Sequence, residues 1–133
     1  MIYVLDACAI IAALRKEAGA KIVKQALLEA GGQCIAHSVN LCEVYYIFHR
    51  NAGEKVAAQA IEDIRTLGLV ERSDFDEAFW KEAGNLKAQG KISLPDCFAI
   101  TLTNRVGGTL LTSDHGEMDP LAAAGVCSIT FIR

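Results

Sequence analysis

Four acidic side chains stand in apolar surroundings, where a solvated charge is unexpected: Asp6, Glu43, Asp96 and Asp114. Two of them follow apolar, β-favouring runs at residues 2–5 and 109–112, and the other two lie in apolar stretches with helical spacing. Four carboxylates gathered in one apolar pocket could not all stay ionised unless a cation compensated their charge. Oxygen ligands without a supporting His or Cys cluster suit Mg²⁺ or Mn²⁺ better than zinc. The residue types therefore predict a divalent metal site, provided that the fold brings the four acids together.

Most of these acids also have a purely structural interpretation as helix caps. The capping-box pattern occurs at Ser93-x-x-Asp96, Asn40-x-x-Glu43 and Asp114-x-x-Glu117, and also at Ser73-x-x-Asp76. The last of these lies in a segment with no sign of chemistry, so the pattern alone does not separate a cap from a ligand. Asp6 fits the capping interpretation least well, because the residue three positions later is Ala9.

Five short apolar runs alternate with helical stretches along the chain. The predicted strands are residues 2–5, 34–36, 69–70 with their flanks, 109–112 and 128–132. The predicted helices are residues 20–30, 39–51, 54–67, 75–89 and 96–106. Strands that alternate with helices in this way form a parallel sheet with both faces covered. The sequence therefore predicts an α/β fold, a three-layer α/β/α sandwich with a central, mainly parallel five-stranded sheet.

Such a sheet would bring the four acids to one edge. Asp6 and Asp114 follow predicted strands, and ligands of these folds bind at the edge where the carboxyl ends of the strands meet. Glu43 opens the helix after the second strand, and Asp96 opens the helix before the fourth. If both helices pack beside that edge, the four carboxylates converge.

Length and composition predict one domain, residues 1–133, without a membrane segment. A mass of 14.3 kDa corresponds to a folded surface of roughly 6,800 Å². The longest uncharged apolar run, residues 7–14, is too short to cross a bilayer, and no basic segment precedes it as in a secretory signal. The five cysteines are odd in number and contain no C-x-x-C pair, which is typical of free thiols in a reducing compartment. We therefore expect a cytoplasmic protein.

The net charge of −3 does not by itself favour a nucleic-acid partner. Without the four acids of the predicted metal site, however, the rest of the chain carries +1. The acidic balance therefore does not count against RNA. Seven basic residues are candidates for phosphate contacts, with solubilising surface charge as the alternative for most of them: Arg15, Lys16, Lys21, Lys24, Lys87, Lys91 and Arg105.

Four motifs contain the acids: Ile2-Tyr3-Val4-Leu5-Asp6, Ser38-x4-Glu43, Ser93-Leu94-Pro95-Asp96 and Gly108-Thr109-Leu110-Leu111-Thr112-Ser113-Asp114. Their order and spacing resemble those of PIN domains, most of all the VapC-type toxins of bacterial and archaeal toxin–antitoxin pairs. The resemblance spans the whole chain. It implies a Mg²⁺- or Mn²⁺-dependent endoribonuclease in which the four acids bind the metal, RNA is the substrate and a small cognate antitoxin is the partner. Members of the family typically leave a 5′-phosphate and a 3′-hydroxyl.

Five further residues are candidates to support this site: Cys8, Ser38, Ser113, Glu117 and Asp119. Cys8 stands where the family often has Ser or Thr, and a thiol is a poorer hydrogen-bonding group and a poor Mg²⁺ ligand. Glu117 stands three residues after the fourth acid, where the family often has another Asp. We expect residues 113–119 to form a solvated loop, with His115 at the surface.

The alternative function is a PIN-like module that binds RNA or another protein without catalysis. A degenerate site of that kind should have lost an acid, whereas all four are present. The 52% hydrophobic content exceeds what a small core needs. Together with the aromatic residues between Glu43 and Asp96, it predicts a surface for an antitoxin or a second copy, and we expect a homodimer.

Overall fold

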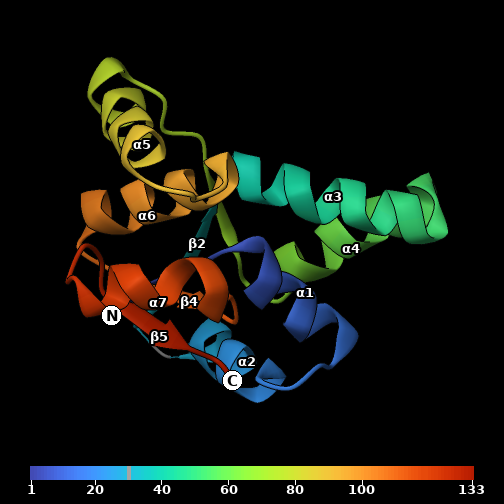
Figure 1. The fold of residues 1–133 in the computed structure, drawn as a ribbon. Coiled ribbons are helices and arrows are strands. Elements are labelled where there is room, and N and C mark those ends of the chain that lie inside the picture. The colour runs from blue at the N-terminus through green and yellow to red at the C-terminus, as the bar shows by residue number, and fades with distance from the viewer. Residues whose placement is uncertain (30) are drawn as a thin grey trace.

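A five-stranded parallel sheet forms the centre of the structure, with the strand order β3-β2-β1-β4-β5 (Figure 1). The computed structural model describes residues 1–29 and 31–133. The strands are β1 (Ile2–Leu5), β2 (Gln33–His37), β3 (Val70–Arg72), β4 (Thr109–Thr112) and β5 (Ile129–Phe131). Val4 of β1 lies opposite Ile35 of β2 and Leu110 of β4, and every neighbouring pair of strands runs parallel. The predicted sheet is confirmed.

Helices fill the connections between the strands. They are α1 (Ala7–Arg15), α2 (Ala20–Leu28), α3 (Ser38–Ala52), α4 (Glu54–Thr66), α5 (Glu77–Gln89), α6 (Leu94–Val106) and α7 (His115–Ala123). The predicted helix at residues 20–30 ends at Leu28, and residue 30 lies outside the described residues. None of the helices in the described part of the chain is long and apolar enough to span a membrane.

Two helices, α1 and α7, were not predicted from the sequence. In α1 six of the nine residues are buried, so the helix is apolar nearly all round and lacks the polar face that makes a helix recognisable. In α7 the sequence contains Gly116 and Pro120, which both disfavour a helix interior. The expected solvated loop at residues 113–119 is therefore wrong from His115 onward.

The two faces of the sheet bury separate cores, which gives the three layers. Successive strand residues point to opposite faces. Leu5 and Leu111 pack with buried residues of α1, α2, α3 and α4, whereas Val4 and Leu110 pack with those of α5, α6 and α7. In Figure 1, α5 lies against α6 on the side away from α1 to α4. The accessible surface of 6825 Å² agrees with the roughly 6,800 Å² expected for this mass.

The turn between α1 and α2 depends on a glycine. Gly19 has φ +91°, and a Cβ atom there would lie 2.6 Å from the carbonyl oxygen of Ile132. We expect Gly19→Ala to lower the free energy of unfolding by about 2 kcal/mol or more and Tm by about 8 °C. Gly84→Ala is the matched control, because Gly84 lies inside α5 with open space around it. It should stabilise the protein by about 0.5 kcal/mol. Thermal melts that show equal shifts for the two variants would contradict this account.

Candidate metal centre

Asp6 lies directly after β1 and forms the N-cap of α1. Its Oδ1 accepts a hydrogen bond from the Ala9 amide at 2.9 Å, while Oδ2 is buried without a hydrogen-bond partner. The side chain is 1% exposed. Burial raises the pKa of Asp6 to about 6, and the charges of Glu43 and Asp114 act in the same direction. A buried carboxylate oxygen without a partner is costly, so this atom is suited to a ligand that the protein alone does not supply.

Asp114 caps the helix that follows β4. Its Oδ1 accepts from the Glu117 amide at 3.2 Å, and its own amide donates to Thr112 Oγ1 at 3.0 Å. In a complete capping box the Glu117 carboxylate would accept a hydrogen bond from the Asp114 amide. Because Thr112 already does so, the Glu117 carboxylate is free for another contact.

The capping box of α6 is also only half formed. Ser93 Oγ accepts from the Asp96 amide at 3.4 Å, but the Ser93 amide donates to Glu117 Oε2 at 3.2 Å and not to Asp96. The Asp96 carboxylate is therefore not used as a cap. Burial raises the pKa of Asp96 to about 8, supported by the neighbouring Glu117 and the charge of Asp6. The hydrogen bond from Asp96 lowers the pKa of Glu117, so without a cation the proton resides on Asp96.

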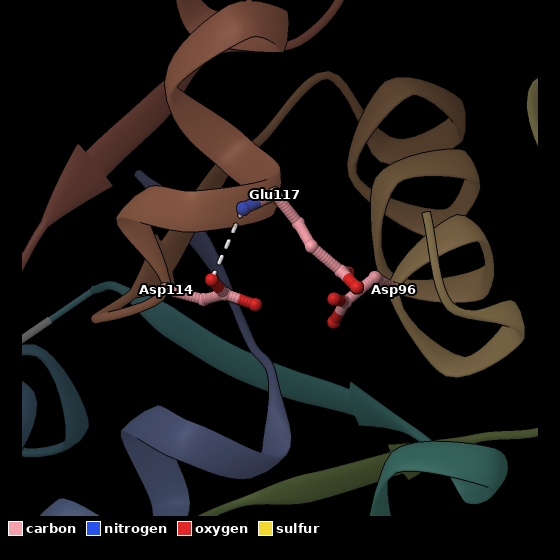
Figure 2. Close-up of side chains that lie close together, drawn as sticks. All are labelled: Asp96, Asp114 and Glu117. Carbon is pink, nitrogen blue, oxygen red and sulfur yellow. Dashed lines mark hydrogen bonds between the residues drawn. The ribbon is translucent and has the colours of Figure 1, made fainter. Parts of the chain in front are cut away.

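Three carboxylates come together between α6 and α7 (Figure 2). Oxygens of Asp96, Asp114 and Glu117 all lie within 4.8 Å of one another. Figure 2 shows Asp114 before the first turn of α7, and Glu117 extending from α7 toward Asp96 on α6. Glu117 is thus a central member of this group, which we call the carboxylate cluster. The predicted loop placed it at the periphery, because the helix that orients it was not recognised.

Glu43 borders the carboxylate cluster from the second turn of α3. That helix begins earlier than predicted: its N-cap is His37, whose Nδ1 accepts from the Val39 amide at 3.0 Å. Asn40 is therefore not a cap but a buried helical residue, and its Nδ2 donates to the Pro95 carbonyl at 3.2 Å. The capping interpretation of Glu43 is wrong. Burial raises the pKa of Glu43, and the nearby charges of Glu117 and Asp114 add to the effect.

Two of the candidate supporting residues, Cys8 and Ser113, lie near the acids. Burial raises the pKa of Cys8 to about 12, and the charges of Asp6, Asp96 and Asp114 raise it further. A hydrogen bond with the Ser113 side chain lowers this pKa in part. The sulfur therefore stays a neutral thiol next to the carboxylates. As a neutral group it adds no further negative charge to the site.

Ser38 and Asp119 lie elsewhere, contrary to the prediction. Ser38 Oγ donates to Glu71 Oε2 at 2.7 Å, so the hydroxyl is directed toward β3. Asp119 Oδ1 is 2.9 Å from His115 Nδ1 on the exposed side of α7. Asp119 is four residues after His115 and five after Asp114, so the helical turn carries it away from the carboxylate cluster.

None of the five acids forms an ion pair with a basic side chain in the described part of the chain. In residues 1–29 and 31–133, no Lys, Arg or His nitrogen lies within 4.0 Å of a carboxylate oxygen of Asp6, Glu43, Asp96, Asp114 or Glu117. The donor set contains only carboxylate oxygens, which a hard divalent cation prefers. The unpartnered Asp6 Oδ2 and the unpaired carboxylate cluster therefore fit Mg²⁺ or Mn²⁺.

The different positions of Glu117 and Asp119 give a testable prediction. Glu117→Gln removes an anionic oxygen from the carboxylate cluster, so we expect the Mn²⁺ dissociation constant to rise about tenfold or more. Asp119→Asn, an equally small change on the same helix, should alter it less than about twofold. Isothermal titration calorimetry with Mn²⁺ measures both. An equal loss in the two variants would show that α7 does not orient these side chains as described.

Solved structures share this fold along nearly their whole length. VapBC2 from Rickettsia felis, solved with a DNA fragment from the promoter, matches with a TM-score of 0.76 and 17% identity, covering 98% of both chains. VapBC-1 from nontypeable Haemophilus influenzae matches with 0.73 and 19%, covering 99% of this chain and 98% of the other. VapC20 from Mycobacterium tuberculosis, a sarcin–ricin loop cleaving toxin, matches with 0.69 and 17%, covering 94% and 95%. At these identities the likeness concerns the fold.

The sequence itself was compared with curated proteins and with family models. No curated protein matches. The model of the PIN domain matches residues 3–122, a range that begins within β1, includes β2 to β4 and contains all five acids. The match covers most of the chain and agrees with the resemblance inferred from the four motifs. The protein therefore belongs to the PIN domain family.

Proposed function

We propose that the protein is a Mg²⁺- or Mn²⁺-dependent endoribonuclease and the toxin of a type II toxin–antitoxin pair. The observation that supports this most directly is the convergence of five carboxylates from four separate segments of the chain, with no ion-pair partner among residues 1–29 and 31–133. Such a site is electrostatically unfavourable unless a cation occupies it. Nucleases use such cations to cleave phosphodiester bonds.

In this proposal the metal ligands are Asp6, Asp96, Asp114 and Glu117, with Glu43 at the border. A divalent cation, when bound there, lowers the pKa of a coordinated water and neutralises charge on the scissile phosphate, so no His base is required. The protein orients the ligands through backbone amides: Ala9 holds one oxygen of Asp6, and Ser93 holds one of Glu117. These amides keep the carboxylates in place before the substrate arrives.

The proposed macromolecular partners are RNA, a small antitoxin and a second copy of the chain. The VapBC structures that share the fold are toxin–antitoxin complexes, which supports an antitoxin partner here. Tyr46 and Trp80 are 39% and 43% exposed and remain candidates for a protein interface. Phe79 does not, because it is buried in the core. The proposal places the protein in the cytoplasm, where these partners are found.

Some of the basic residues predicted to contact RNA phosphates already contact other side chains of the protein. Arg105 binds Asp74 and Asp76 at 3.1 and 2.7 Å, and Arg15 lies over the ring of Phe48 at 4.8 Å from its centre. Both therefore have structural contacts. RNA contacts are accordingly proposed for four lysines, the exposed Lys16, Lys21 and Lys91 and the half-buried Lys24.

Cleavage of RNA by the purified protein tests the proposed activity. Incubation with total RNA and Mg²⁺ or Mn²⁺ should give discrete fragments with 5′-phosphate and 3′-hydroxyl ends, and EDTA should stop the reaction. Fragments that form equally well in EDTA would contradict a metal-dependent mechanism. RNA binding without cleavage in either metal would instead favour the non-catalytic module.

The toxin role needs a separate experiment. Induced expression of the chain alone should arrest growth, and Asp114→Asn should relieve the arrest at equal protein levels. Cleavage in the test tube without growth arrest would favour a housekeeping ribonuclease over a toxin.

A further inference from the structure

The peptide group between Ile92 and Ser93 is bound at both ends by charged side chains. Lys87 Nζ, on α5, donates to the Ile92 carbonyl oxygen at 2.7 Å. The amide of Ser93, at the N-cap of α6, donates to Glu117 Oε2 at 3.2 Å. One peptide group thus connects a cation on α5 with an anion of the carboxylate cluster on α7.

The two hydrogen bonds support each other. In a trans peptide the carbonyl oxygen and the amide hydrogen point in opposite directions, so Lys87 and Glu117 lie on opposite sides of this group. A cation at the oxygen and an anion at the hydrogen polarise the peptide in the same sense, which strengthens both bonds. Lys87 therefore acts on Glu117 through the peptide without pairing with its carboxylate.

The surroundings of this peptide favour a fixed geometry. Ile92 is buried, at 6% exposure, and packs in the core with residues of α5 and α6. Lys87 and Lys81, on the same helix, are both exposed, but Lys87 Nζ binds a backbone carbonyl, whereas Lys81 pairs with Glu77 at 3.3 Å. Lys87 thus has a specific contact, although the sequence suggested only a phosphate contact or a solubilising charge.

We propose that Lys87 is a positioning residue of the metal centre. By holding the Ile92–Ser93 peptide, it keeps the Ser93 amide directed at Glu117 and so keeps Glu117 beside Asp96. The effect on metal binding rests on the proposed function, but the effect on the Ser93 amide does not. The two are therefore tested by different measurements.

Metal affinity is the first measurement, made with Lys87→Met, Lys87→Arg and the matched control Lys81→Met. Mn²⁺ binding is followed by loss of the electron paramagnetic resonance signal of the free ion. We expect Lys87→Met to weaken binding about fivefold to tenfold, Lys87→Arg to restore most of it, and Lys81→Met to match the wild type. Equal affinities of Lys87→Met and wild type would overturn the proposal. If Lys87→Met does not fold, Lys87→Gln provides the same comparison.

The second measurement needs no metal. In ¹H–¹⁵N spectra of the EDTA-treated protein, the Ser93 amide should exchange with solvent about tenfold faster in Lys87→Met than in wild type or Lys81→Met. An unchanged exchange rate would overturn the proposal even if Mn²⁺ binds. A wild type that does not bind Mn²⁺ would contradict the proposed function, while the Ser93 exchange rate would still decide whether Lys87 positions this peptide.

Discussion

Asp96→Asn should reduce RNA cleavage at least about 100-fold in kcat/KM without unfolding the protein. The amide has nearly the shape of the carboxyl group but supplies no anionic oxygen to a cation. The substitution also leaves the helix start intact, because Ser93 Oγ binds the Asp96 backbone amide and not its side chain. In EDTA at neutral pH the Tm should stay within a few degrees of wild type, because burial already keeps this carboxyl group protonated, with a pKa of about 8.

Asp63→Asn is the matched control for this experiment. Asp63 lies on the exposed surface of α4, where Oδ1 accepts from Gln59 Nε2 at 2.8 Å, far from the carboxylate cluster in the fold. Its cleavage rate should equal that of wild type within about twofold. If Asp96→Asn cleaved RNA as fast as Asp63→Asn, Asp96 would not be a metal ligand of the reaction.

The metal-free protein should lose stability as the pH rises, and a divalent cation should reverse the loss. The folded state holds the pKa of Asp6 at about 6 and that of Asp96 at about 8, against 3.8 for a free Asp. Above about pH 4 the folded state therefore binds more protons than the unfolded state, so the free energy of unfolding falls with pH until about pH 8. The total loss should amount to several kcal/mol, with a larger part from Asp96 than from Asp6 because the pKa of Asp96 is raised further.

Other titrating groups contribute differently to this profile. The pKa of Asp74 is lowered to about 2 by Arg72, and its stabilising effect is lost only as the pH falls below about 4. His115 acts in the same direction as Asp96, because its pKa is raised by the Arg133 carbonyl and Asp119. The Asp96→Asn variant separates these effects, since in EDTA it should remove the Asp96 contribution to the profile and leave those of Asp6 and His115.

Urea denaturation in EDTA and in Mg²⁺ or Mn²⁺ at about pH 5 and about pH 8 measures this effect. The cation should stabilise the wild type by about 2 to 3 kcal/mol at the higher pH and much less at the lower. The same stabilisation at both values, or none at either, would show that the cation does not compete with protons for these carboxylates.

Much of the fold could be predicted because strands and amphipathic helices have distinct periods. The strands β1 and β4 coincide with their predicted limits. The two helices that the sequence did not predict, α1 and α7, have no such period. Helix α1 is buried on nearly every side, and α7 contains Pro120 in its interior. Tertiary packing stabilises both helices in spite of their weak local signal, and the local sequence does not reveal that packing.

How well the metal site could be predicted depended on which helices and strands could be predicted. The four acids could be chosen because each stands beside apolar residues at a strand end or helix start, and their topology follows from a parallel sheet. Glu117 could be ranked only once α7 was known. The Glu117 carboxylate does not cap its helix because Thr112 Oγ1 already accepts the hydrogen bond from the Asp114 amide. Residue types alone do not specify such a contact between a side chain and the backbone. The position of the Ser38 hydroxyl could not be predicted either, because a hydroxyl at a helix start has several partners within reach. In the structure it hydrogen-bonds with Glu71, the Arg72 carbonyl and Ser73, all at or next to β3.

The insertion of β4 between β1 and β5 has a consequence for biosynthesis. Asp6 is made near the start of translation, but Asp114 and Glu117 join it only after β4 has paired with β1. A growing chain that ends before residue 117 therefore contains no complete metal site, however well its earlier helices have folded. An endoribonuclease of the kind proposed above would therefore acquire its metal site late in synthesis, only after β4 and α7 have folded against the earlier strands.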